Sequence, residues 1–170
     1  PAVLDVGTGS GCIAVTLARL IPGARVTAVD ISEKALSIAR ENARRLDAEV
    51  DFRQGDALGE LFPGQREQFD LIVSNPPYIP SQVIEGLEPE VKDHEPRMAL
   101  DGEPDGLKFY RILAEEGKKY LKNGGSIYME IGWDQAKDVT EIFEAMGFSG
   151  RRTVRDMAGN DRVVCARKEK

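Results

Sequence analysis

Short apolar runs alternate along the chain with segments in which apolar residues recur at helical spacing. This alternation is typical of a sheet whose parallel strands are connected by helices that pack against it. The pattern predicts strands at residues 3–6, 25–30, 50–54, 69–74 and 126–131. It predicts helices at residues 11–20, 33–46, 107–121 and 135–146, the second capped by Ser32 and the third ended by Asn123, Gly124 and Gly125.

Two further strands are predicted near residues 150–156 and 162–166, joined by a segment with the composition of a hairpin turn, Met157-Ala-Gly-Asn160. A terminal hairpin adds an antiparallel strand to an otherwise parallel sheet. We therefore expect an α/β fold in one domain over residues 1–170: a doubly wound, mostly parallel, seven-stranded sheet. Residues 75–105 are rich in proline and show little periodicity, and a long irregular segment inside a domain is usually functional.

A glycine-rich loop, Asp5-Val-Gly-Thr-Gly-Ser-Gly11, joins the first predicted strand to the first predicted helix. Glycines let the backbone approach a ligand, and the helix start behind them offers unpaired N–H groups. Asp30 ends the second strand, where a carboxylate can accept hydrogen bonds from both hydroxyls of a ribose. These features predict a nucleoside-bearing cofactor, although the glycine spacing departs from the dinucleotide pattern G-x-G-x-x-G and a purely structural turn is the alternative.

The third predicted strand ends at the same edge of the sheet, in Gly55-Asp56-Ala57. A carboxylate at that place could accept a hydrogen bond from the amino group of an adenine. A polar strand end that binds nothing is an equally simple interpretation of these three residues.

The fourth predicted strand runs into Ser74-Asn-Pro-Pro-Tyr-Ile-Pro80, which should lie beside the cofactor at the topological switch point of the sheet. Pro77 lacks an N–H group and biases Pro76 toward an extended conformation, so the Pro76 carbonyl is rigid and lacks a nearby donor. The side chain of Asn75 supplies a second acceptor. Two fixed acceptors in one pocket suit a planar amino group, whose flat face Tyr78 could cover.

An amide or aromatic amine is a poor nucleophile because its nitrogen lone pair is delocalised. Acceptors for both of its N–H groups return electron density to nitrogen and stabilise the positive charge that grows during attack. Holding the nitrogen about 3–3.5 Å from an electrophilic carbon supplies the orientation. The electrophile that best matches an adenosine site is the sulfonium methyl of S-adenosyl-L-methionine, which leaves S-adenosyl-L-homocysteine. The sequence therefore predicts methyl transfer to nitrogen, with Asn75, Pro76 and Tyr78 as catalytic residues and no metal.

Composition narrows the class of partner. The 170 residues carry a net charge of −6, whereas a protein that neutralises phosphates is usually basic, so we expect no stable nucleic-acid binding. Cys12 and Cys165 lie far apart without metal-ligand spacing, which favours free thiols in a reducing compartment. No apolar stretch approaches the roughly 18 residues of a transmembrane helix. We expect a cytoplasmic monomer that does not bind membranes.

Taken together, the motifs resemble those of the class I S-adenosylmethionine-dependent methyltransferases. Within that class the chain resembles the release-factor glutamine N5-methyltransferases, the PrmC/HemK family, over essentially its whole length. The matching motifs are Val3-Leu-Asp-Val-Gly-Thr-Gly-Ser-Gly11, Val29-Asp-Ile-Ser32, Asn75-Pro-Pro-Tyr78, Glu95-Pro-Arg-Met-Ala-Leu100, Asp105-Gly106, Glu130-Ile-Gly132 and Asp156-Met-Ala-Gly-Asn-Asp-Arg162.

The resemblance implies a Rossmann-like methyltransferase fold and assigns residues to the cofactor and the substrate. It implies that the substrate glutamine amide is bound by Asn75, Pro76 and Pro77 and covered by Tyr78. It implies that S-adenosyl-L-methionine is held by Gly7, Thr8, Gly9, Ser10, Gly11, Asp30, Ile31, Gly55, Asp56, Ala57 and Asn75. Several family members carry a larger side chain at position 57. A helical substrate-docking domain precedes the first strand in the family, so we expect residues 1–170 to be the catalytic domain without it.

The leading hypothesis is methylation of the glutamine in the Gly-Gly-Gln loop of a class I peptide chain release factor. Glutamine methylation of ribosomal protein L3 and adenine N6-methylation of DNA are alternatives, because the same tetrapeptide could support both. The stretch from Glu130 to Gln135 and the hairpin tail favour the release factor. A nucleotide-binding module without catalysis is a further alternative, but it leaves Asn75-Pro-Pro-Tyr78 unexplained.

Several other residues have plainer interpretations. His94 lies in a charged stretch and is expected to be a solvated loop residue. Arg97 could orient the loop over the site or pair with Asp93 or Glu95. Residues 81–104 are a candidate lid, since this chemistry requires that water be excluded. Asp156 and Arg162 flank the predicted hairpin turn, where a structural ion pair is favoured over a catalytic role.

Overall fold

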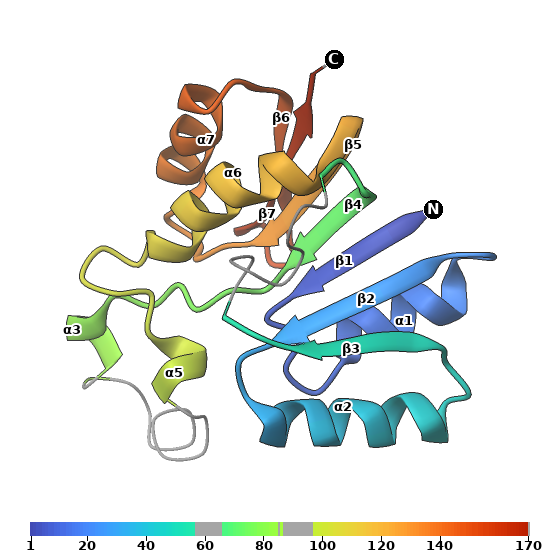
Figure 1. Cartoon of the computed structure of the whole chain (residues 1–170). Helices are drawn as coiled ribbons and strands as arrows, with labels where there is room; N and C mark the ends of the chain where they lie inside the picture. Colours follow the sequence, from blue (N-terminus) through green and yellow to red (C-terminus); the bar gives the residue numbers. More distant parts are fainter. Residues whose placement is uncertain (57–65, 85, 87–96, 170) are drawn as a thin grey trace.

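The computed structural model describes residues 1–56, 66–84, 86 and 97–169. Within these residues the strands form a seven-stranded sheet in the order β3-β2-β1-β4-β5-β7-β6 (Figure 1). The strands are β1 (Ala2–Val6), β2 (Arg25–Asp30), β3 (Val50–Gln54), β4 (Phe69–Ser74), β5 (Leu121–Glu130), β6 (Phe148–Arg155) and β7 (Asp161–Lys168). β1 to β5 pair in parallel, and β7 is antiparallel to both of its neighbours. The predicted α/β fold with an antiparallel terminal hairpin is therefore confirmed.

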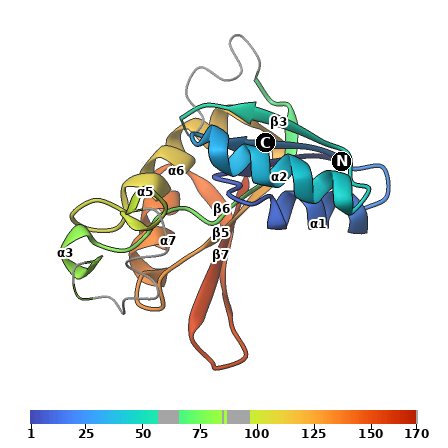
Figure 2. The ribbon, with the colours of Figure 1, turned by 90° about the horizontal axis from the view of Figure 1, so that it is seen from below.

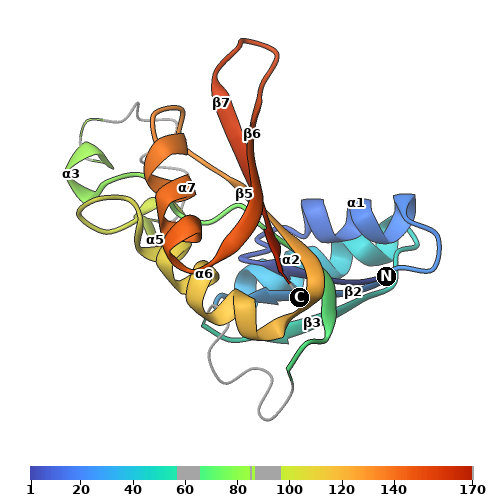
Figure 3. The ribbon, with the colours of Figure 1, turned by 90° about the horizontal axis from the view of Figure 1, so that it is seen from above.

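Helices cover both faces of the sheet, as Figure 3 shows. The described helices are α1 (Cys12–Leu20), α2 (Glu33–Arg45), α3 (Ser81–Ile84), α5 (Arg97–Leu100), α6 (Lys108–Tyr120) and α7 (Ala136–Ala145). α1 packs against β1 to β3 and α2 against β2 and β3, whereas α6 packs against β5 and α7 against β6 and β7. Consecutive residues of β1 pack on opposite faces of the sheet. Val3 packs in a cluster with residues of α1, and Leu4 packs in the larger cluster with residues of α6 and α7. Such burial on both faces explains the nearly continuous apolar runs.

The predicted bounds of most helices and strands agree closely with the observed ones. The predicted strands at 25–30, 50–54 and 69–74 have the observed bounds. The Ser32 hydroxyl accepts a hydrogen bond from the Ala35 N–H at 3.2 Å and begins α2 as predicted. The Asp156 carboxylate accepts hydrogen bonds from the N–H groups of Ala158 and Asn160 in the turn between β6 and β7. Figure 2 shows that this hairpin projects away from the rest of the chain.

The helix predicted at residues 107–121 agrees with α6 to within one residue at each end, but the predicted stop at Asn123, Gly124 and Gly125 does not lie between the helix and the next strand. α6 ends at Tyr120, and these three residues lie within β5. β5 advances by five residues, from Leu121 to Ser126, while its neighbour advances by two, from Phe69 to Leu71. The extra residues form an irregularity that glycine tolerates, since Gly124 has a φ of +80°. Turn-forming glycines inside a bulged strand resemble a helix end in sequence alone.

The described residues within 75–105 form more regular structure than their lack of periodicity suggested. The described part of the segment contains the short helices α3 and α5. Ile79 and Asp101 form a parallel bridge, in which the Ile79 N–H donates to the Leu100 carbonyl and the Gly102 N–H donates to the Ile79 carbonyl. One-turn helices leave no repeat that a periodicity test can detect. Residues 100–102 therefore run alongside Ile79, which follows β4.

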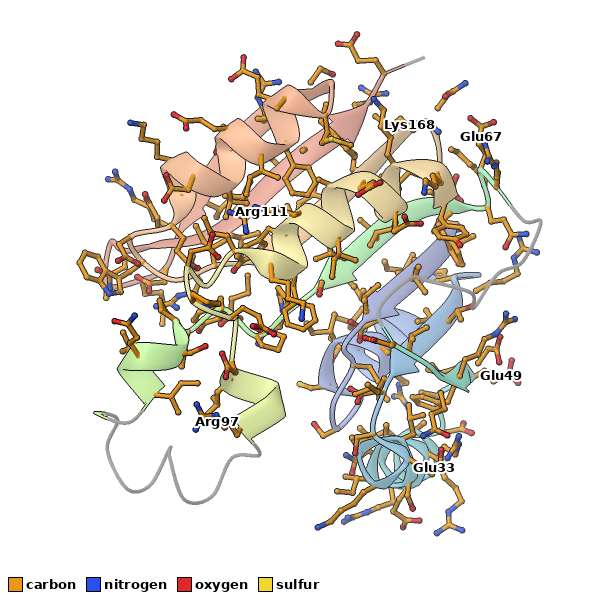
Figure 4. The ribbon with its side chains drawn as sticks, turned by 60° about the vertical axis from the view of Figure 1, so that its left-hand side comes forward. Glu33, Glu49, Glu67, Arg97, Arg111 and Lys168 are labelled. Atoms are coloured by element: carbon orange, nitrogen blue, oxygen red, sulfur yellow. The ribbon has the colours of Figure 1, made fainter. Side chains whose placement is uncertain are left out.

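The strand register aligns three chain segments at the carboxyl edge of the sheet. Val6 of β1 pairs with Val29 of β2 on one side and with Ser74 of β4 on the other. The Ser74 hydroxyl donates to the Val6 carbonyl at 2.7 Å, which ties the two strands together where they end. Residues 7, 30 and 75 therefore leave the sheet side by side. At the opposite end Lys168 and Glu67 form an ion pair of 3.1 Å (Figure 4).

A substitution of Gly11, the N-cap of α1, tests how closely α1 and α2 pack against each other. A Cβ at Gly11 would lie 2.9 Å from Ala39 Cβ, and its φ is +80°, whereas Gly23 has a φ of +70° with no described atom within 4 Å of its Cβ. In urea unfolding we expect Gly23→Ala to cost about 1–2 kcal/mol from backbone strain alone. We expect Gly11→Ala to cost about 1–3 kcal/mol more, because the helices must separate.

The double variant Gly11→Ala with Ala39→Gly separates the cost of backbone strain from the cost of moving the two helices apart. Removing the Ala39 methyl group should recover the steric part, so the double variant should be more stable than the sum of the two single changes predicts. Strict additivity of the two free-energy changes would show that Gly11 and Ala39 do not constrain each other.

Candidate active site

A cavity of about 370 Å³ opens at the carboxyl edge of the sheet, within the range of roughly 300–1,000 Å³ that small-molecule sites occupy. Its walls come from the ends of β1, β2, β3 and β4 and from α2, α5 and α6. Among its lining residues are the predicted site residues Gly7, Gly9, Ser10, Asp30, Ile31, Gly55, Asp56, Asn75, Pro76 and Pro77. The topological switch point, where β1 lies between β2 and β4, thus holds the predicted cofactor loop and the predicted substrate segment together.

The Asp30 carboxylate organises the glycine loop. One oxygen accepts a hydrogen bond from the Gly9 N–H at 2.8 Å, and the other accepts from the Ser32 N–H at 2.9 Å. The N–H groups of Gly7 and Thr8 donate to the Val29 carbonyl at 2.9 and 3.0 Å. These bonds hold the loop against the end of β2, and the free lone pairs of the Asp30 carboxylate can accept hydrogen bonds from ligand hydroxyls.

Glycine is required in this loop mainly because the backbone adopts positive φ angles there. Gly7 and Gly9 have φ values of +72° and +56°, and a Cβ on either would meet no described atom within 4 Å. Side chains other than glycine rarely adopt this conformation, so the loop depends on residues without a Cβ. The space left open beside Gly7 and Gly9 belongs to the cavity that both residues line.

Asp5 places a second carboxylate behind the loop, inside the sheet. One of its oxygens accepts hydrogen bonds from the Thr8 hydroxyl at 2.7 Å and the Ala14 N–H at 3.1 Å. The other oxygen is buried with no hydrogen-bond partner among the described residues. Burial, with a smaller contribution from the nearby Asp30 charge, raises the pKa of Asp5 from 3.8 to about 6, against the opposing effect of the two hydrogen bonds.

The part of the cavity between α2 and α6 is largely apolar. Side chains from these helices and from the adjoining strand ends form its walls, namely Val6, Val29, Ile31, Ala35, Ile38, Phe109, Ile112 and Leu113. Asp56 lies at the rim, and the Gly55 N–H donates to the Asp30 carbonyl at 3.0 Å, which ties the end of β3 to that of β2. Apolar walls together with a carboxylate in the lining suit a flat heterocycle that carries a donor. Ala57 lies outside the described residues.

Residues of the segment after β4 line the same cavity. Asn75 is exposed, Pro76 is buried, and both line the cavity together with Pro77. Tyr78 is half-buried and lies outside the lining. Its hydroxyl is 3.4 Å from a carboxylate oxygen of Glu130, the last residue of β5, and burial together with the Glu130 charge raises the pKa of the Tyr78 phenol.

The hairpin contacts this segment through one arginine. The Arg162 guanidinium pairs with Asp156 at 3.3 Å, as the sequence predicted, and a second nitrogen lies 3.4 Å from the Ile131 carbonyl. Hydrogen bonds from the turn and from Arg162 lower the pKa of Asp156, while Arg162 opposes the rise in the pKa of Tyr78. Arg162 therefore joins the turn end of the hairpin to Ile131, the residue that follows Glu130.

The structure places the remaining predicted residues as follows. Thr8 and Gly11 lie outside the cavity lining, because the Thr8 hydroxyl is turned toward Asp5 and Gly11 packs against α2. Arg97, on α5 (Figure 4), forms an ion pair of 3.4 Å with Asp101 rather than a described contact with the cavity. His94, Glu95 and most of residues 85–96 lie outside the described part of the chain, so the lid remains a prediction.

Sequence reasoning assigned no role to several residues that shape the site. Asp5 is one, although a carboxylate inside an apolar strand was a signal that could have marked it. Phe109 and Ile112 of α6 and Ile38 of α2 also line the cavity. These apolar side chains resemble core residues in a helical pattern, and only the fold brings them to the strand ends.

The comparisons with known proteins agree with this geometry. Residues 2–163 match a family model described as a methyltransferase domain. The chain belongs to this methyltransferase-domain family. A methyltransferase from Pyrococcus furiosus, 22% identical, has the same fold with a TM-score of 0.73, covering 99% of this chain and 75% of that one.

The chain is also similar to curated proteins named release factor glutamine methyltransferase. It is 49% identical over 166 residues to the one from Geobacter sulfurreducens, covering 98% of this chain and 57% of the relative. It is 48% identical over 164 residues to the one from Caulobacter vibrioides, covering 96% and 56%. The chain therefore spans about half the length of the curated relatives it matches.

The described residues contain neither a membrane-spanning helix nor a metal-binding cluster. No helix among them is long and apolar enough to cross a membrane. No group of three or more histidine, cysteine or acidic side chains within residues 1–56, 66–84, 86 and 97–169 could hold a metal ion. Cys12 is exposed and Cys165 buried, and neither forms a disulfide in this part of the methyltransferase domain, which confirms the prediction of free thiols.

The raised pKa of Asp5 predicts a pH dependence of stability. Because the folded chain holds this proton more tightly than the unfolded chain, the contribution of Asp5 is fully present below pH 3.8 and is lost as the pH rises through about 6. As the pH rises through this range, we expect the deprotonation of Asp5 to lower the free energy of unfolding by about 3 kcal/mol. Asp5→Asn should abolish this loss in urea titrations.

The relevant quantity is the stability difference between wild type and Asp5→Asn at each pH. Carboxylates whose pKa is lowered, such as Asp70 and Asp105, change stability in the opposite direction but contribute equally to both proteins and cancel. If the difference stayed constant across this pH range, Asp5 would have an ordinary pKa in the folded chain.

Proposed function

We propose that this domain transfers a methyl group from S-adenosyl-L-methionine to the side-chain amide nitrogen of a glutamine. The protein substrate would be a class I peptide chain release factor, and the glutamine that of its Gly-Gly-Gln loop. The observation that carries the proposal is that Asn75 and Pro76 line the same cavity as Asp30 and the glycine loop. One cavity thus combines a site for a nucleoside with two acceptors for an amide.

The residues present fit this cofactor. Asp30 has free lone pairs for the two ribose hydroxyls, and the apolar slot between Ile38 and Phe109 suits an adenine ring with Asp56 at its rim. Asp5 does not line the cavity and supports the loop from behind, where it accepts a hydrogen bond from the Thr8 hydroxyl. The cofactor supplies an electrophilic methyl group and accepts the bonding electron pair at its sulfur.

Asn75 and Pro76 would activate the substrate nitrogen. The Asn75 side-chain oxygen and the Pro76 carbonyl each accept one N–H of the amide, which draws the nitrogen lone pair out of conjugation as the new N–C bond forms. The same two acceptors stabilise the positive charge that develops on nitrogen. The proton leaves after the bond has formed, so no strong base is required beforehand. Buried Pro76 and half-buried Pro77 keep water away from one side of the amide.

The nature of the substrate is supported by the relatives. Proteins named release factor glutamine methyltransferase are 43–49% identical to nearly the whole of this chain, with four of them at 43, 45, 48 and 49%. These names favour a release factor over ribosomal protein L3 or DNA adenine. We retain the release factor as the partner and residues 1–170 as a methyltransferase domain of the full protein.

The direct test is to supply labelled S-adenosyl-L-methionine with a purified class I release factor, ribosomal protein L3 or duplex DNA, and to locate the label by mass spectrometry. We expect one methyl group on the glutamine of the Gly-Gly-Gln loop and none on the other two substrates. A release factor in which that glutamine is replaced by glutamate should accept no label. Label on DNA adenine or on L3 alone would contradict the proposal.

The roles of Asn75 and Asp30 predict opposite kinetic signatures. Asn75→Ala removes one acceptor for the amide, so the rate at saturating cofactor should fall by roughly 10²–10³ while cofactor affinity changes little. Asp30→Ala removes the ribose acceptors and should weaken cofactor binding by roughly 10–100-fold. Asn123→Ala, at an exposed position of β5, is the matched control and should leave both quantities unchanged. Loss of cofactor binding in Asn75→Ala with normal turnover would refute its assigned role.

A further inference from the structure

Gln135, the N-cap residue of α7, holds a buried primary amide beside the segment that follows β4. It is 7% exposed. Its Nε2 donates to the Tyr78 carbonyl at 2.9 Å and to the Gly106 carbonyl at 3.3 Å. Its Oε1 accepts from the Gly132 N–H at 2.9 Å and lies 3.4 Å from the Tyr110 hydroxyl. Both hydrogens and the oxygen of the amide are therefore used.

The network determines which way the amide points. Tyr78 and Gly106 offer carbonyl oxygens, whereas Gly132 offers an N–H group. Exchanging the oxygen and nitrogen of Gln135 would set an oxygen against two carbonyls and an NH2 group against a donor. An unsatisfied polar group at such a buried position is costly, so the observed orientation is strongly preferred.

The backbone around the amide has no spare room. A Cβ at Gly106 would lie 2.5 Å from the Tyr78 carbonyl oxygen and 2.7 Å from Gln135 Nε2. A Cβ at Gly132 would lie 2.9 Å from Gln135 Oε1, and one at Gly102 would lie 2.9 Å from Tyr78 Cα. Glycines at these three positions thus allow the amide and the Tyr78 backbone to approach closely.

Few torsions separate this fixed carbonyl from the acceptors of the site. On one side of the segment, Ser74 is held by its pairing with Met129 and by its hydroxyl bond to Val6. On the other side, Gln135 holds the Tyr78 carbonyl. Between them Pro76 and Pro77 have fixed φ angles, so anchoring both ends sets the direction of the Pro76 carbonyl and of the Asn75 side chain.

We propose that Gln135 is a positioning residue, whose amide holds the Tyr78 carbonyl and thereby aims Asn75 and Pro76 at the substrate nitrogen. This inference rests on the proposed function for its kinetic consequences. Gln135 does not touch the cavity, so it acts through the segment and not on the substrate. A misplacement of about 1 Å in the acceptors is enough to reduce turnover by roughly 10²-fold.

Gln135→Glu tests the anchor with the smallest change of shape. A glutamate keeps an oxygen for the Gly132 N–H but, when ionised, sets a charge against the carbonyls of Tyr78 and Gly106. We expect kcat at about pH 8 to fall by roughly 10–100-fold, with KM and cofactor affinity near those of wild type. A protonated glutamate can donate to the Tyr78 carbonyl, so kcat relative to wild type should recover as the pH falls toward about 6.

The surroundings of residue 135 support this pH signature. The titratable side chain in contact with the amide is Tyr110, whose pKa is raised by burial, so it stays neutral throughout the range. Glu130 and Arg162 face the hydroxyl of Tyr78 rather than the amide. Recovery at low pH that is confined to Gln135→Glu therefore reports the new carboxyl group.

A second variant displaces the same carbonyl from the opposite side. Gly106→Ala places a methyl group against the Tyr78 carbonyl and Gln135 and should lower kcat by a similar factor at every pH, without recovery. Gly23→Ala has the same sign of φ and no described neighbour within 4 Å, so it controls for backbone strain and should keep wild-type kcat. Thermal unfolding of all variants identifies any that fail to fold.

A readout independent of methyl transfer separates this inference from the proposed function. The phenol pKa of Tyr78, followed by carbon-13 NMR and assigned with Tyr78→Phe, is raised by burial and by Glu130. We expect Gly106→Ala, which displaces the Tyr78 backbone without adding a charge, to shift this pKa toward its ordinary value. If wild type fails to methylate release factors, the proposed function falls and this titration still tests the anchor. An unchanged Tyr78 titration, or wild-type kcat in Gln135→Glu, would overturn the inference.

Discussion

The parallel pairing of β1 between β2 and β4 is the constraint on which the rest of the site depends. The register sets Val6 opposite both Val29 and Ser74, so the chain leaves all three strands at one edge. The Ser74 hydroxyl bond to the Val6 carbonyl locks that alignment. Because parallel strands end together, a cofactor loop and a substrate segment that lie almost 70 residues apart in sequence (Ser74 and Val6 are separated by 68) become neighbours.

The polar groups at this edge hold backbone in place and leave acceptors free for ligands. Asp30 uses two backbone N–H groups to shape the glycine loop, and Gln135 uses its whole amide to hold the segment after β4. The cavity walls that α2 and α6 form are apolar, and these two helices lie on opposite sides of the sheet. Rigid acceptors in an apolar cavity suit a reaction whose transition state carries more positive charge on nitrogen than its ground state.

Sequence patterns predicted most of the fold because apolar runs and turn residues are local signals. The bounds of β2, β3 and β4 and the Ser32 cap followed from such signals. Gly124 and Gly125 misled because a glycine in a bulge and a glycine at a helix end look alike. Motif and strand position predicted that Asn75, Pro76 and Asp30 lie together at the strand ends, and all three line the cavity. The places of Phe109 and Gln135 depend on contacts between distant elements, which no local pattern records.

We propose that one edge of the sheet holds an amide nitrogen by two acceptors in front of the cofactor. A crystal structure with S-adenosyl-L-homocysteine and a peptide that contains Gly-Gly-Gln tests it most directly. We expect the glutamine amide nitrogen to lie within hydrogen-bond distance, about 3 Å, of both the Asn75 side-chain oxygen and the Pro76 carbonyl, with the ribose on Asp30. A glutamine bound away from these two acceptors, or a ribose held elsewhere, would contradict it.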